Sequence, residues 1–97
     1  MDLVVHIEAG PGIVEATATP EIGQPPLTVV FAATVEPGAK PITDMWWEFG
    51  DGSEPIHEAE ATHVYTDLGV YKAIFHAVDE NEVEATAELT VTVKWLP

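Results

Sequence analysis

The residues best suited to covalent catalysis lie within one short stretch, from Asp51 to His57. Ser53 is the chain's single serine, two residues after Asp51 and four before His57. A nucleophilic serine needs a base beside it and an acid that orients the base. Here all three would lie on one turn-rich loop with no evident oxyanion hole, and unsupported loops rarely hold such geometry. The stretch therefore does not predict a catalytic triad.

Paired carboxylates offer a second kind of catalysis, glycoside hydrolysis, which needs two of them about 5–10 Å apart around a sugar cleft. Among seventeen acidic residues, some pair will always meet that spacing. A chain of 97 residues forms one small domain with little room for a deep cleft. We therefore predict that the protein is not an enzyme.

Oxygen ligands gather in the segment 79–82, where Asp79, Asn81 and Glu82 are the candidate calcium ligands. The regular ligand spacing and central glycine of a dedicated calcium loop are missing, so an ordinary solvated hairpin turn is the alternative. The four histidines show no i,i+4 or His-x-His spacing, and the chain has no cysteine, so no zinc site is predicted. We expect no metal and no cofactor.

The charge of the chain excludes two classes of partner. Seventeen acidic side chains face three lysines and no arginine, which gives a formal net charge of −14. Such a surface repels the phosphates of nucleic acids and anionic membranes, and no apolar run approaches the roughly 20 residues of a membrane span. The acidity favours solubility or, as an alternative, adaptation to high salt. A protein or a glycan remains as the expected partner.

Alternation of apolar and polar residues recurs along the chain, whereas helical periodicity does not. The residues predicted to face a core are Leu27, Val29, Phe31, Ala33 and Val35; Tyr71, Ala73, Phe75 and Ala77; and Ala87, Leu89, Val91, Val93 and Trp95. Turns rich in glycine, proline and aspartate separate these runs. The pattern predicts an all-β chain that folds as an antiparallel two-sheet sandwich.

Three motifs within this pattern, "WWEFGDGS", "HVY" and "GVYKAIFHAVDEN", resemble those of the PKD domain (polycystic kidney disease repeat), an immunoglobulin-like β-sandwich. The matching residues are Trp47, Phe49, Gly50, Asp51, Gly52, His63, Tyr65, Gly69, Tyr71, Phe75 and Asp79. Glu48 and Met45 depart from the family pattern, which usually has Asp and Tyr there. The resemblance covers residues 13–93, so we expect a PKD-like domain over 13–97 and an N-terminal arm or extra strand over 1–12.

The resemblance and the alternation together distinguish two adjacent tryptophans. Neighbours in a strand point to opposite faces, and the family register assigns Trp47 to the core and Trp46 to the outer face. Tyr71 is expected to form a tyrosine corner, with its hydroxyl bonded to backbone near the preceding turn. Asp51 is expected to cap turn amides beside Gly50 and Gly52, which permit positive φ. All of these signature residues are predicted to be structural.

The predicted binding surface is the outer face that carries Trp46. Ile74 and His76 are expected beside it, flanked by Thr90 and Thr92, as one exposed apolar patch. The apolar residues Leu3, Val4, Val5 and Ile7 of the arm would add a second contact. The alternative is that the arm, or the loop after Val35, folds over the patch.

Two functions without catalysis follow from this arrangement. The first is a stand-alone virion surface protein of a tailed phage, a capsid decoration or fibre protein that binds other virion subunits. It rests on the lack of a signal peptide and on the expectation that the chain is a complete product made in the cytoplasm. The second is an accessory protein- or carbohydrate-binding PKD domain from a larger secreted hydrolase or surface-layer protein, which would be extracellular.

Overall fold

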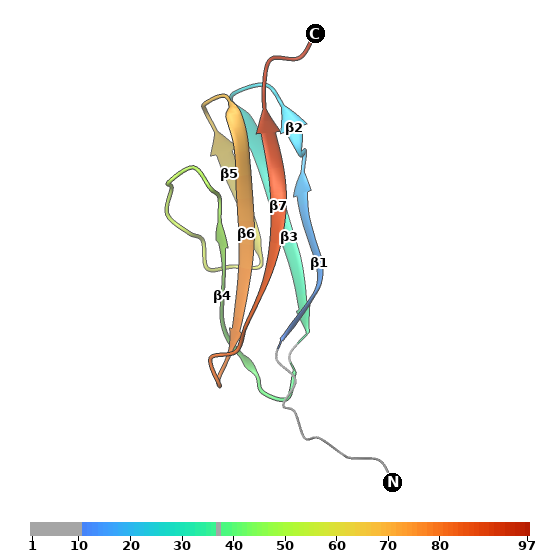
Figure 1. The fold of residues 1–97 in the computed structure, drawn as a ribbon, viewed down its shortest axis with the longest axis vertical. Helices are drawn as coiled ribbons and strands as arrows, with labels where there is room; N and C mark the ends of the chain where they lie inside the picture. The colour runs from blue at the N-terminus through green and yellow to red at the C-terminus, as the bar shows by residue number, and fades with distance from the viewer. Residues whose placement is uncertain (1–10, 37) are drawn as a thin grey trace.

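The computed structural model describes residues 11–36 and 38–97, which form two packed β-sheets without a helix (Figure 1). One sheet has the order β1 (Gly12–Thr19), β3 (Leu27–Glu36) and β5 (Glu60–Tyr65). The other has the order β2 (Ile22–Gly23), β7 (Glu84–Val93), β6 (Gly69–Asp79) and β4 (Ile42–Glu48). All pairings are antiparallel except the two-residue parallel contact of β2 with β7. The predicted all-β sandwich is confirmed.

The core lies between the sheets and is built by the inward-facing residues of β1, β3, β4, β5, β6 and β7. Trp47 is 0% exposed, and its ring centroid lies 5.0 Å from that of Phe31 and 4.9 Å from that of Phe75. Its indole Nε1–H donates to the carbonyl of Ala59 at 2.9 Å, so the buried donor is satisfied. The assignment of Trp47 to the core is therefore confirmed.

Trp95 does not join the core as predicted. β7 ends at Val93, and Trp95 follows it with 64% of its surface exposed. The prediction extended the alternation of Val91 and Val93 by one step too many, to Trp95, because the period itself does not mark where the strand ends.

The first strand begins at Gly12, and Pro11 before it is buried. The arm residues Leu3, Val4, Val5 and Ile7 lie outside the described residues. No helix in the described part of the chain is long and apolar enough to cross a membrane.

The segment 49–59 crosses from β4 to β5, that is, from one sheet to the other, and stands out from the side of the sandwich (Figure 1). Ile56 first exchanges two backbone hydrogen bonds with Trp47, at 2.8 and 3.1 Å. The chain then turns away, and the carbonyl of Ala59 accepts the amide of Ala33 on β3 at 3.0 Å. Apart from this contact with Ile56, the outer edge of β4 has no neighbouring strand among the described residues.

Candidate functional site

The Gly50–Gly52 turn is organised by the carboxylate of Asp51. One oxygen, Oδ1, accepts the amide of Ser53 at 3.1 Å and also its hydroxyl, and Oδ2 accepts from Nε2 of His63 at 2.7 Å. Partial burial raises the pKa of Asp51, but the hydrogen bonds from Ser53 and His63 outweigh it and hold this pKa below its usual value. The predicted capping role of Asp51 is confirmed.

The geometry of this turn does not suit a nucleophilic serine. His63, on β5, is the histidine beside Ser53, whereas His57 bonds to Asp44 instead. Nε2 of His63 already faces Asp51 at 2.7 Å and is 3.4 Å from the hydroxyl of Ser53. Because Nε2 must carry a proton to donate to the Asp51 carboxylate, it has no free lone pair to take the serine proton. The cluster fixes the turn.

Aromatic contacts tie this turn to the core and to the predicted tyrosine corner. The ring of His63 stacks on Phe49 with centroids 4.1 Å apart, and the hydroxyl of Tyr65 donates to the carbonyl of Phe49 at 2.8 Å. Burial raises the pKa of Tyr65. Tyr71 donates its hydroxyl to the carbonyl of Asp67 at 2.8 Å, which confirms the corner.

The candidate calcium ligands lie in the β6–β7 turn. Asp79 is 2% exposed, and its Oδ1 accepts the amides of Asn81 and Val83 at 2.8 and 3.0 Å. Glu82 follows with φ at 61°, and its amide bonds to the carbonyl of Asp79 at 2.9 Å. No group of three or more metal-ligating side chains gathers within residues 11–36 and 38–97. Asp79 therefore serves as the cap of a hairpin turn.

Trp46 lies on the outer face of the four-stranded sheet, directly across from His76 on β6. The two rings are stacked, with centroids 4.7 Å apart and planes 8° from parallel. The ring of His57, from the crossing segment, lies 5.8 Å away from the indole. Trp46 is therefore partly buried between two imidazoles rather than fully exposed.

His76 is held by two carboxylates from its neighbouring strands. Its Nε2 faces Glu48 Oε2 on β4 at 3.2 Å, and its Nδ1 makes a short contact with Glu84 Oε1 on β7. A carboxylate only accepts hydrogen bonds, so both contacts are satisfied when the ring carries both protons. The stack thus fixes the orientation of the indole.

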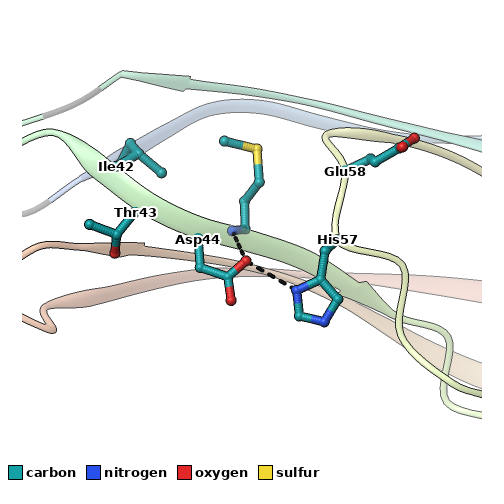
Figure 2. Close-up of a pocket in the computed structure, with 6 residues that line it drawn as sticks. Ile42, Thr43, Asp44, His57 and Glu58 are labelled. Atoms are coloured by element: carbon teal, nitrogen blue, oxygen red, sulfur yellow. Dashed lines mark hydrogen bonds and ion pairs between the residues drawn. The ribbon is translucent and has the colours of Figure 1, made fainter.

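A cavity of about 300 Å³ adjoins this cluster at the edge of β4. It is lined by Ile42, Thr43, Asp44, Met45, His57 and Glu58. Figure 2 shows Asp44 and His57 pointing toward each other, and Asp44 Oδ1 lies 3.0 Å from His57 Nδ1. The hydrogen bond from His57 is the main cause that lowers the pKa of Asp44, so Asp44 stays ionised to lower pH than usual.

The predicted trio of Trp46, Ile74 and His76 does share one face, but it is not an exposed apolar patch. All three are partly buried, and Ile74 lies across from Glu48 and Glu88 rather than from Trp46. Thr90 and Thr92 lie on the same face, opposite Lys72 and Val70, so Thr90 is the diagonal neighbour of Ile74. Two carboxylates, of Glu48 and Glu84, hold the His76 ring that stacks on the indole.

Sequence reasoning also missed several exposed apolar side chains of this sheet. Val70, at 69%, and Ile22, at 47%, lie on either side of Thr92 on the outer face, and Trp95 and Leu96 follow β7. Thr86 and Glu84 flank His76 at the other end of the same strands. Counting back along β6 and β7 from the turn at 79–82 would have placed Val70 opposite Thr92 and Thr86 opposite His76, because that turn sets the pairing of these two strands.

Comparison with known proteins places the fold. One similar structure is that of carbohydrate-binding modules of the β-sandwich superfamily, which are described as having promiscuous specificity. It matches with a TM-score of 0.78 at 24% identity over 91% of this chain. The chain spans only 36% of that longer chain. The PKD1 domain of the Vibrio cholerae metalloprotease PrtV matches with a TM-score of 0.73 at 24% identity, over 90% of this chain and 100% of that one. The PKD1 domain of Vibrio anguillarum Epp gives 0.71 at 18% identity, over 93% and 100%.

No curated protein matches the sequence significantly. The sequence does match the PKD domain family over residues 9–93, which is most of its length. The signature residues expected from the resemblance occupy the turn, strand and corner positions described above. The chain belongs to the PKD domain family.

Proposed function

We propose that this domain is a non-catalytic module that binds a glycan chain through the outer face of its four-stranded sheet. The observation that carries the proposal is the indole of Trp46, stacked at 4.7 Å on His76, which two carboxylates hold in place. An aromatic face packs against the apolar C–H faces of a sugar ring. Carboxylates and imidazoles beside it hydrogen-bond to sugar hydroxyls.

The shape and charge of this face narrow the class of glycan. The face is a sheet surface, which suits a chain of sugars lying across it better than one enclosed sugar. The two histidines beside the indole pair with the carboxylates of Asp44, Glu48 and Glu84, and the chain carries a net charge of −14. A polyuronate would therefore be repelled, and a neutral or amine-bearing polysaccharide is the expected ligand. The carbohydrate-binding modules that share the fold support a carbohydrate as the ligand.

The test is retention on immobilised polysaccharides, measured by affinity electrophoresis in neutral, amine-bearing and uronate gels. The wild type is expected to be retarded in at least one of the first two gels and not in the third. Trp46→Ala should lose the retardation. Trp95→Ala, which removes the most exposed tryptophan, is the matched control and should keep it. Loss with Trp95→Ala alone, or retardation by the uronate gel, would refute the proposal.

A virion decoration role, the first function predicted from the sequence, remains a prediction. No contact or comparison above bears on a capsid or other virion subunit. Co-sedimentation of the protein with undecorated phage capsids is its test. Binding that survives Trp46→Ala and needs residues 1–12 would favour it over glycan binding.

A further inference from the structure

The outer edge of β4 offers hydrogen-bonding groups that no strand of the described fold uses. Trp47 uses this edge to pair with Ile56. Hydrogen-bonding direction alternates along a strand, so Met45, two residues earlier, presents its backbone N–H and C=O to the same side. The crossing segment leaves the edge after Ile56 and so does not reach Met45 with a backbone pair.

The amide of Met45 is instead capped by a side chain. Asp44 Oδ1 accepts this N–H at 2.8 Å, in the place that a partner strand's carbonyl would take, and the same oxygen lies 3.0 Å from His57. Both Asp44 and His57 have about half of their side-chain surface exposed, at 49% and 57%. An exposed cap of this kind is readily exchanged for another acceptor.

The cavity beside this edge is lined by both apolar and acidic side chains. Ile42 and Met45 are partly buried, and Met45 packs against the core. Asp44 and Glu58 contribute carboxylates, and no lysine is among the lining residues. The side chains of an added strand point alternately to the two faces of the sheet. A segment that carries both apolar and basic residues therefore matches the cavity in composition and in charge.

We propose that the β4 edge from Ile42 to Met45 is a docking site for an extended peptide that carries lysine or arginine at alternate positions. The peptide pairs with Met45 as an added strand, and its carbonyl replaces Asp44 as the acceptor of the Met45 amide. The released carboxylate then faces the basic side chains of the peptide. The pairing is short because Ile56 blocks the edge at Trp47.

The probe is the capped pentapeptide Lys-Val-Lys-Val-Lys, added to the ¹⁵N-labelled protein. The Met45 amide should shift saturably, and its hydrogen exchange should slow by about tenfold at saturation. Added salt should weaken the binding, since ion pairs at an exposed edge are screened. A Glu-Val-Glu-Val-Glu peptide, and a lysine peptide N-methylated on its backbone, should leave the amide unchanged.

Variants separate charge from strand pairing. Asp44→Asn keeps an oxygen that can cap the amide, so it should weaken the lysine peptide several-fold and leave a Thr-Val-Thr-Val-Thr peptide unaffected. Glu21→Gln makes the same charge change at the opposite edge of this sheet and should have no effect. Equal binding of the N-methylated peptide, or shifts that avoid Met45, would overturn the proposal.

This docking is separable from glycan binding. Trp46→Ala should keep the lysine peptide, because the indole lies on the sheet face and not at the edge. A protein that binds glycans but shifts no edge amide would refute peptide docking alone, and the reverse result would refute glycan binding alone.

Discussion

The two adjacent tryptophans allow a matched pair of substitutions whose effects should differ sharply. Trp47→Ala removes a side chain that is 0% exposed and is packed between Phe31 and Phe75. Such a large-to-small change in a core costs about 3–5 kcal/mol in the free energy of unfolding. The carbonyl of Ala59 stays satisfied, because the Ala33 amide also bonds to it. The cost is therefore that of the lost packing.

Trp46→Ala should cost much less. The indole is only partly buried, and its main contact is the stack on His76. Partial burial and one aromatic stack together amount to about 1–2 kcal/mol. A domain of this size has about 5–15 kcal/mol in total, so the Trp46 variant should stay folded while the Trp47 variant approaches the limit.

The assay is urea unfolding followed by far-UV circular dichroism, because tryptophan fluorescence changes with the substitutions themselves. Trp47→Phe is the second core variant and keeps the measurement possible if Trp47→Ala does not fold. It should cost less than Trp47→Ala but more than a surface change. Equal costs for the two alanine variants would refute the assignment of one indole to the core and the other to the outer face.

Two further predictions concern the signature turn. Gly50→Ala and Gly52→Ala both place a side chain at a positive φ, of 81° and 85° respectively. A Cβ at Gly50 would lie 2.3 Å from the backbone oxygen of Lys72, whereas a Cβ at Gly52 would meet nothing within 4 Å. Gly52→Ala should cost about 1–2 kcal/mol and Gly50→Ala clearly more, in the same urea assay; similar costs would contradict this. The pKa of Asp51 in the folded protein lies below the usual 3.8. The ionised carboxylate therefore stabilises the fold above pH 3.8, and this stabilisation is lost as the pH falls through the lowered pKa. The stability gap between wild type and Asp51→Asn should be largest near neutral pH and shrink below about pH 3.8; a gap that does not change with pH would show that the carboxylate charge plays no part.

Much of the fold was predictable because its signals are local. The period of two in β3 and β6 identified the core residues Phe31 and Phe75, and the turn motif located Trp47 and Asp51. The hairpin alternative for Asp79 also followed from local turn chemistry. These features depend on residues close in sequence, so period and spacing suffice.

The candidate site was predictable only in outline, since it depends on which residues of different strands face each other. Trp46 and His76 were placed on one face by alternation. The carboxylates of Glu48 and Glu84 around His76 follow from register, which period alone does not give. The pairing of Asp44 with His57 depends on the path of a loop that has no repeating pattern. The exposure of Trp95 depends on where the sheet ends, which is set by packing.

The most direct test of glycan binding at the outer face uses the three tryptophans as reporters. Each indole N–H gives its own signal in a ¹H–¹⁵N spectrum, and single substitutions assign Trp46 and Trp95. On titration with oligosaccharides of the polysaccharide that retains the protein, the Trp46 signal should shift saturably. The Trp47 signal, buried and bonded to Ala59, should stay in place. An unmoved Trp46 signal, or a shift at Trp95 alone, would contradict binding at the outer face.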